Sequence, residues 1–267
     1  MGVREAQTGS LRRVKLTLEY DGAGFFGWQV QAQGERTVQG VLEAALAALT
    51  GAKPRVMAAG RTDRGVHALA MVAHYDTADT VPEARVARAL NGLLPADVRV
   101  LTAEGVAADF EARFSCRYRR YLYKLRLARG GFAGQALERG RVLFLPQRLD
   151  VARMIAAAPR FEGRRDFAAL ATQEERTTER EVYLCRLEPS GSDLSGSDLS
   201  LQVAADGFLR GMVRAIVGTL LYVGEGKLAP GDLDGLLATG ERRRLGPNAP
   251  AHALYFAEAG YEPWPGR

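Results

Sequence analysis

Asp63 is the residue of this 267-residue sequence whose type and surroundings best suit covalent chemistry. It lies in the stretch AGRTDRGVHA (residues 59–68), with Arg61 and Arg64 on either side and His67 shortly after. A neighbouring guanidinium favours the ionised form of a carboxylate, which keeps it available as a nucleophile. The alternative is a solvated turn without a catalytic role, because Asp followed two residues later by Gly is common in turns.

Arg214 is a cation within a segment that is otherwise mostly apolar. We predict one helix over residues 207–223, and Arg214 shares a narrow arc of it with Arg210 and with three glycines, Gly207, Gly211 and Gly218. Glycines allow close approach of another backbone or a ligand, and a cation in a largely buried helix needs an anionic partner. That partner is either a structural carboxylate or a functional one such as Asp63.

Tyr121 is the third candidate, in the predicted strand RRYLYKLRL (residues 119–127). Alternation puts Tyr121, Tyr123, Leu125 and Leu127 on one face, so a core position is the default interpretation. Arg119 and Arg120 precede it, and a basic strand with interleaved tyrosines is also what a base-stacking surface requires.

A glycine motif, G-x-G-x-x-G at Gly22, Gly24 and Gly27, follows the first predicted strand. It is the pattern of a dinucleotide-binding turn, which would make the protein an NAD(P)-dependent oxidoreductase. In that fold the third glycine lies in the crossover helix, whereas here helical spacing begins only at Val38. We therefore favour an aromatic loop that packs or stacks.

The charge of the chain favours nucleic acid only mildly. Basic residues number 36 against 31 acidic ones, and only four of the 36 are lysines. Guanidinium groups suit phosphate and nucleobase contacts, although codon bias or heat adaptation gives the same composition. No apolar stretch suggests a membrane span or a secretion signal, and the two cysteines, Cys116 and Cys185, are far apart. We expect a cytoplasmic protein with no membrane association and no structural metal.

The elements that must position these residues follow the same order twice. The first half reads β-α-β-β-α-β, with strands near residues 14–20, 55–59, 69–75 and 98–101, a helix from a Thr37 cap to Gly51, and a second helix opened by Pro82. The second half repeats it, with strands near 119–127, 182–188, 199–205 and 253–259, a helix capped by Asp150 that carries Val151, Met154, Ile155 and Ala158, and the helix at 207–223.

These patterns predict an α+β protein of two ferredoxin-like halves with mainly antiparallel sheets, over residues 11–107 and 112–267. The boundary falls within residues 106–116. A ferredoxin-like sheet often supports RNA binding but does not decide function by itself. The loop at 190–200 contains GSDLS twice in succession, and we interpret it as a tolerated hairpin insertion without a function.

At these residues the sequence resembles the tRNA pseudouridine synthase A family. The most specific element is GRTDRGVHA at 60–68. In family order it is accompanied by YDGAGFFGWQ at 20–29, TVQGVLE at 37–43, ARFSCRYRRYLY at 112–123, FLRGMVRAIVG at 208–218 and ALYF at 253–256. Six matches in order make chance an unattractive explanation.

The resemblance implies an isomerase that converts uridine to pseudouridine at positions 38, 39 and 40 in the anticodon stem-loop of tRNA, after extruding the base from its stack. It implies a homodimer, no cofactor, no metal, and two halves joined around a central cleft. Asp63 would be the nucleophile, Tyr121 would lie beside the target base, and Arg61 would assist base flipping. Arg214 would pair with Asp63, and Leu254 would line the pocket.

Some points stay open at this stage. Asp63 could attack C6 of the uracil or C1′ of the ribose, and either Tyr121 or Asp63 could remove the C5 proton. The sequence departs from the family pattern at Arg210-Gly211, where an aromatic residue or His is usual, at Ala215 in place of Asn, and at Ala253 in place of Gly. These departures bear on RNA contacts near Arg214. The alternative from another class is a non-catalytic tRNA-binding protein.

Overall fold

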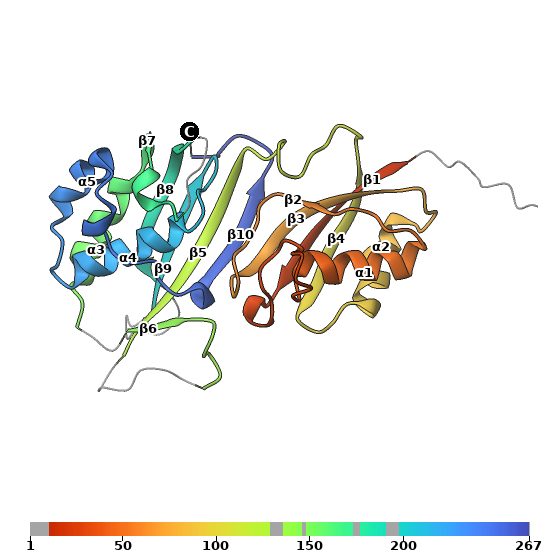
Figure 1. Cartoon of the computed structure of the whole chain (residues 1–267), viewed down its shortest axis with the longest axis horizontal. Helices are drawn as coiled ribbons and strands as arrows, with labels where there is room; N and C mark the ends of the chain where they lie inside the picture. The colour runs from red at the N-terminus through yellow and green to blue at the C-terminus, as the bar shows by residue number, and fades with distance from the viewer. Residues whose placement is uncertain (1–10, 129–135, 146–147, 173–176, 191–197, 267) are drawn as a thin grey trace, which may run out of the picture. The chain divides into compact units, whose positions relative to one another are not determined.

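The computed structural model in Figure 1 describes residues 11–128, 136–145, 148–172, 177–190 and 198–266. The chain forms two compact units, Met1–Cys116 and Arg117–Arg267. Each unit contains its own set of strands and helices. No helix in the described part of the chain is long and apolar enough to cross a membrane.

The first unit has the β-α-β-β-α-β order. Its elements are β1 (Arg12–Tyr20), α1 (Val38–Thr50), β2 (Met57–Ala58), β3 (His67–Thr77), α2 (Glu83–Leu93) and β4 (Val98–Val106). The strands lie in the order β4-β1-β3-β2, and each pairs antiparallel with its neighbour. In β1 the alternate residues Val14, Leu16 and Leu18 are buried, because successive side chains of a strand point to opposite faces.

The ends of α1 are those that the sequence predicts. The hydroxyl of Thr37 accepts a hydrogen bond from the Gly40 amide at 3.3 Å, which satisfies one of the unpaired donors of the first turn. Gly51 ends the helix with φ of 72°, a conformation that glycine adopts without a steric penalty. The helix therefore begins and ends at local signals.

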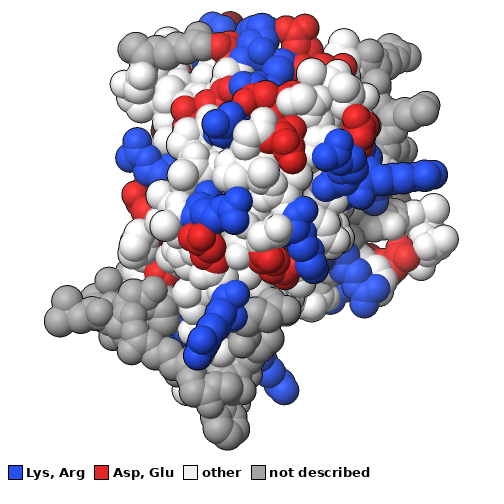
Figure 2. Space-filling model, turned by 90° about the vertical axis from the view of Figure 1, so that its left-hand side faces the viewer, with Lys and Arg blue, Asp and Glu red and all other residues white. Residues whose placement is uncertain are grey.

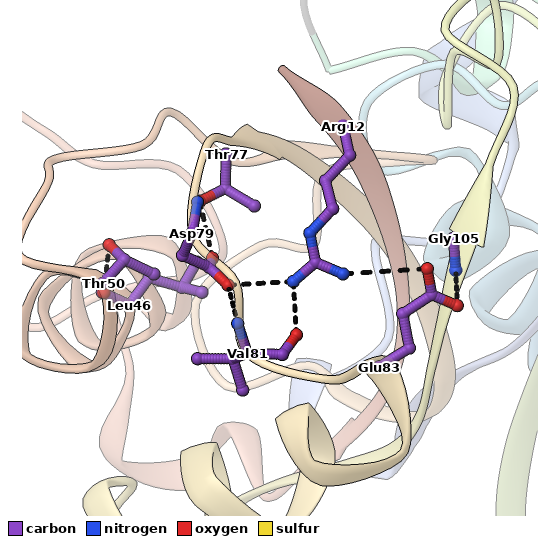
Figure 3. Close-up of polar contacts among 8 residues, drawn as sticks. All are labelled: Arg12, Leu46, Thr50, Thr77, Asp79, Val81, Glu83 and Gly105. Atoms are coloured by element: carbon purple, nitrogen blue, oxygen red, sulfur yellow. Dashed lines mark hydrogen bonds and ion pairs between the residues drawn. The ribbon is translucent and has the colours of Figure 1, made fainter. Parts of the chain in front are cut away.

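Arg12 ties the start of β1 to the segment before α2 (Figure 3). Its guanidinium bonds the Asp79 carboxylate at 2.8 Å and the Val81 carbonyl at 2.5 Å, and it lies 3.7 Å from the Glu83 carboxylate. Glu83 in turn accepts a hydrogen bond from the Gly105 amide of β4 at 2.9 Å. This network joins three elements of the first unit.

The second unit repeats the order with additions. Its elements are β5 (Tyr118–Leu127), β6 (Leu143–Leu145), α3 (Val151–Ala157), β7 (Gly163–Asp166), β8 (Glu179–Pro189), β9 (Asp198–Ala205), α4 (Met212–Gly224), α5 (Leu233–Thr239) and β10 (Leu254–Gly260). The strand order is β10-β5-β9-β8-β7, all antiparallel, and β6 pairs parallel with β5. Without β6, β7 and α5 this is the arrangement of the first unit, so the α+β class with two ferredoxin-like halves is confirmed.

Short 3-10 helices connect these elements. They lie at Gly22–Gly24, Ala158–Phe161, Ala168–Leu170, Pro230–Asp232, Arg242–Arg244 and Ala251–Ala253.

Three details of the sequence prediction are wrong. The helix predicted over 207–223 begins at Met212, because Gly211 has φ of 77° and turns the backbone out of the helical path. Ile155 is 37% exposed, although its spacing suggested a buried face. Asp198, predicted in the loop at 190–200, is the first residue of β9, and residues 191–197, which hold most of the GSDLS repeat, lie outside the described residues.

Candidate active site

Asp63 lies on the loop between β2 and β3 of the first unit. The side chain is half-buried, whereas the neighbouring Arg61 and Arg64 are exposed. The Val66 amide donates to the Asp63 carbonyl at 3.1 Å, and Gly65 adopts φ of 79° between them. The predicted turn is present, and it presents a carboxylate between two exposed cations.

The last residue of β1 and the segment that follows it are hydrogen-bonded to this loop. The Trp28 amide donates to the Thr62 carbonyl at 3.0 Å, and the hydroxyls of Tyr20 and Thr62 share a hydrogen bond of 2.8 Å. The Gly65 amide donates to the Phe25 carbonyl at 3.3 Å. Thr62 is only 6% exposed, so the residue next to Asp63 is part of the core. The carboxylate is therefore carried by a rigidly bonded loop.

Two of the three motif glycines permit this close packing. A Cβ atom on Gly22 would lie 2.0 Å from the Val66 carbonyl oxygen, and one on Gly27 would lie 2.6 Å from the Thr62 carbonyl oxygen. Gly27 also has φ of 101°, which L residues rarely adopt. Residues 25–37 form no helix, so the helix that a dinucleotide-binding turn requires is missing there. These glycines bring two backbone segments together.

His67 adds a polar contact to the same junction. It is 3% exposed, and its Nδ1 atom accepts a hydrogen bond from the Gly22 amide at 3.1 Å. The same nitrogen lies 3.1 Å from the Asp21 carboxylate. In the sequence His67 stands out only as a neighbour of Asp63, whereas in the structure its ring joins the loop to the segment that follows β1.

Tyr121 lies on β5 of the second unit, within an aromatic cluster. Its ring packs edge-to-face against Phe208 and Phe256, with centroid distances of 5.0 and 5.3 Å. In the sheet it stands opposite Phe256 of β10 and Val203 of β9. The residue is 9% exposed. Packing of this kind holds a ring in one orientation, which suits both a core residue and a fixed contact for a base.

Arg214 lies in the first turn of α4 and is half-buried. Its Nε atom donates to the Ala249 carbonyl at 2.6 Å, and the Ala249 amide donates back to the Arg214 carbonyl at 2.9 Å. A Cβ atom on Gly218 would lie 1.6 Å from the Pro247 carbonyl oxygen, so the segment at 246–250 packs directly on the helix. The backbone of that segment fixes the direction of the guanidinium.

The same segment leads into β10, where Leu254 is 5% exposed and stands opposite Tyr123 of β5. The Tyr123 hydroxyl donates to the Pro250 carbonyl at 2.9 Å. Burial raises the pKa of Tyr123, and the charge of Arg214 opposes only part of that rise, so the phenol is neutral. Arg214, Leu254 and Tyr123 are thus gathered around one backbone segment.

The predicted stripe on α4 is only partly correct. Arg214 and Gly218 lie one turn apart on the helix, whereas Gly207, Arg210 and Gly211 precede its first residue. The Arg210 carbonyl instead accepts hydrogen bonds from the amide and the hydroxyl of Thr172, at 2.9 and 3.0 Å.

The arginine-rich composition does not mark every surface as a nucleic-acid site. Figure 2 shows the side of the second unit that carries α5, where basic and acidic side chains are interspersed. Arg160 and Arg165 both bond the Asp234 carboxylate there, at 2.8 and 2.9 Å. Such pairing leaves little net charge on this surface to attract phosphates.

Comparison with known sequences identifies the family. The sequence model of a family described as tRNA pseudouridine synthase matches residues 17–115 and 157–262. The tRNA pseudouridine synthase A of Thermus thermophilus is 46% identical over 251 residues, which cover 94% of this chain and 97% of that one. Proteins of the same name from Nitrobacter winogradskyi and Ruminiclostridium cellulolyticum are 43% and 37% identical, each over 94% of this chain and 96% and 100% of theirs.

Matches of this length at this identity place the chain among RNA-modifying isomerases. It belongs to the tRNA pseudouridine synthase family. The resemblance drawn from the six motifs is therefore confirmed, and so is the prediction of an enzyme. Asp63, Arg61, Arg214 and Leu254 lie within the two matched stretches, and Tyr121 lies between them.

Proposed function

We propose that the chain converts uridine to pseudouridine at positions 38, 39 and 40 in the anticodon stem-loop of tRNA, with Asp63 as the nucleophile. One observation carries the proposal: in a chain of this family, Asp63 is a half-buried carboxylate on a loop bonded to the core, between two exposed arginines. Such a loop holds a nucleophile in a fixed position, and the arginines suit a polyanionic substrate.

The reaction begins with the extrusion of the target uridine, because a base in a stem is shielded by stacking. Extrusion costs a few kcal/mol, which contacts between arginines and phosphates offset. Arg61 is exposed beside Asp63, and it occupies the space that the base leaves. Tyr121 lies beside the extruded base, and Leu254 lines the pocket. Arg214, whose direction Ala249 fixes, pairs with Asp63.

Asp63 attacks either C6 of the uracil or C1′ of the ribose, and the bond between N1 and C1′ breaks. The base then turns and C5 bonds to C1′. The bond between Asp63 and the substrate breaks, which frees the carboxylate, the proton on C5 is removed, and N1 gains a proton. Tyr121 or Asp63 itself accepts the proton from C5. The atoms are only rearranged, so the reaction needs no electron donor, electron acceptor or phosphoryl group.

The experiment uses an unmodified tRNA transcript with uridines inside and outside the anticodon stem-loop. Incubation with the protein, followed by mapping of pseudouridine, should give product at positions 38 to 40 and at no other uridine. The variant Asp63→Asn should give no product and keep its affinity for tRNA, because the amide has nearly the same shape and cannot act as the nucleophile.

Asp109→Asn is the matched control, since Asp109 is an exposed carboxylate of the same unit, and this variant should behave as the wild type. Product from Asp63→Asn at the wild-type rate would remove Asp63 from the proposed role. Tight tRNA binding without product in the wild type would instead indicate a non-catalytic tRNA-binding protein.

We also propose that the protein is a cytoplasmic homodimer, as the family resemblance implies. Light scattering at micromolar protein concentration should give twice the chain mass of 28.9 kDa. A mass of one chain at that concentration would contradict the dimer.

A further inference from the structure

Arg64 and Phe26 form a stacked pair on the surface of the first unit, next to the proposed nucleophile. The central carbon of the Arg64 guanidinium lies 4.2 Å from the centroid of the Phe26 ring. Phe26 is 39% exposed, although Phe25 and Trp28 nearby are 1% and 2% exposed. One aromatic residue of this segment therefore faces outward, and a cation covers its ring.

Backbone hydrogen bonds fix this pair relative to Asp63. The Phe26 amide donates to the Arg36 carbonyl at 2.9 Å, and the Phe25 carbonyl accepts from the Gly65 amide at 3.3 Å. One of these bonds is made by Phe26 itself, and the other joins the residue before Phe26 to the residue after Arg64. Together they restrict the backbone at both positions. The stack thus stands at a set distance from the carboxylate that precedes Arg64 in the chain.

Among the described residues, no ion pair neutralises the charge of Arg64. In the described part of the chain no carboxylate lies within ion-pair distance of its guanidinium. Arg36 provides the contrast, because it stacks on Phe25 at 4.0 Å and also bonds both oxygens of Asp97 at 2.8 Å. Stacking uses the flat face of a guanidinium and leaves its N–H groups, which lie in the plane, available for an anion.

We propose that Arg64 binds a backbone phosphate of the RNA beside the target nucleotide, and that Phe26 holds the guanidinium in position for it. The proposal rests on the proposed function, since it takes the substrate to be RNA. The planar fork of N–H donors matches two phosphate oxygens, and the ring reduces the side-chain freedom that binding would otherwise remove. Phe26 is a positioning residue in this scheme, and Arg64 contacts the RNA.

The test measures equilibrium binding of tRNA over a range of salt concentrations, with every variant built on Asp63→Asn so that no turnover occurs. Loss of one phosphate contact lowers the slope of log affinity against log salt by about 0.7 to 0.9. Arg64→Gln should show this change. Arg85→Gln, which removes an equal charge from an exposed position on α2, should keep the slope of the parent.

The positioning role of Phe26 is tested by substituting it with and without Arg64 present. An exposed stack of this kind contributes about 0.5 to 1 kcal/mol, so Phe26→Leu should weaken tRNA binding about two- to fivefold without lowering the salt slope. In a chain that already carries Arg64→Gln, Phe26→Leu should cause no further loss. Thermal unfolding of each variant separates loss of fold from loss of contact.

Two results would overturn the inference. An unchanged salt slope in Arg64→Gln would show that Arg64 meets no phosphate. Losses that add in the double variant would show that Phe26 acts independently of Arg64. Failure of the proposed function has a different signature, because it is the absence of pseudouridine after incubation with the wild-type protein, whereas the salt slope is measured without turnover.

Discussion

The substitution Gly27→Ala should displace the loop that carries Asp63, although residue 27 is not part of that loop. The φ of 101° at this position costs an alanine about 1 to 3 kcal/mol. The new Cβ atom would lie 2.6 Å from the Thr62 carbonyl oxygen, so that oxygen must move by about 0.8 Å to reach an ordinary contact of 3.4 Å. Overpacking of this degree costs a further 1 to 3 kcal/mol or so. The free energy of unfolding should therefore fall by about 2 to 6 kcal/mol.

Turnover should fall as well, because Thr62 is bonded directly to Asp63 in the chain. A displacement near 1 Å at a reacting group can cost about 100-fold in rate, so we expect Gly27→Ala to lose about 10- to 100-fold in kcat at a temperature where it remains folded. The assay combines thermal unfolding with single-turnover formation of pseudouridine in a tRNA transcript.

Gly24→Ala is the matched control within the same motif. A Cβ atom there would lie 3.1 Å from the end of the exposed Arg36 side chain and 3.6 Å, an ordinary contact, from the Asp97 carboxylate, so only the end of Arg36 must shift, by a few tenths of an ångström. The variant should keep wild-type turnover and lose less than about 1 kcal/mol of stability. A Gly24→Ala variant as damaged as Gly27→Ala, or a Gly27→Ala variant with wild-type turnover, would refute the reasoning. A dinucleotide-binding turn predicts instead that Gly24 is critical.

Three further predictions concern other parts of the chain. Arg214→Met should lower kcat far more than tRNA affinity if the guanidinium acts on Asp63, and equal losses would indicate a contact with the RNA. Tyr75→Phe should leave the free energy of unfolding unchanged or raise it by up to about 1 kcal/mol in urea titrations, because the buried hydroxyl has no hydrogen-bond partner among the described residues; a clear loss would contradict this. Burial raises the pKa of Asp79, but hydrogen bonds from Thr77, Val81 and Arg12 outweigh it, so the pKa lies below the ordinary 3.8. The stability lost in Asp79→Asn should thus be largest above pH 4 and shrink as pH falls through the lowered pKa, and a difference that grows on acidification would be inconsistent with it.

The parts of the fold that the sequence predicts well are those with local signals at both ends. Thr37 and Gly51 are a polar cap and a glycine stop, and α1 runs between them as predicted. The alternation in β1 and β5 likewise needs only the neighbouring residues. The start of α4 depends on one glycine, because the apolar spacing continues through Phe208 and Leu209 although the backbone turns at Gly211. β7 and α5 are short and have no strong periodicity, and neither was predicted.

In the candidate site too, features with local sequence signals could be predicted, and features that depend on residues distant in sequence could not. The loop character around Asp63 is evident from composition, whereas the role of nucleophile that we propose for it rests on the resemblance to a family. The purpose of Gly22 and Gly27 could not be predicted, because it depends on carbonyl groups of Val66 and Thr62, which lie far away in sequence. The Arg64 stack was missed for the same reason, since Phe26 and Arg64 lie 38 positions apart in the sequence and meet only in the folded unit.

The central claim is that the Asp63 carboxylate performs the isomerisation. The most direct measurement is the release of tritium from C5-labelled uridine in tRNA, by the wild type and by Asp63→Asn, at enzyme concentrations that saturate the RNA in both. The account predicts release by the wild type without added metal or nucleotide, and none by the variant while it still binds the tRNA. Release by Asp63→Asn at a rate comparable with the wild type would contradict it.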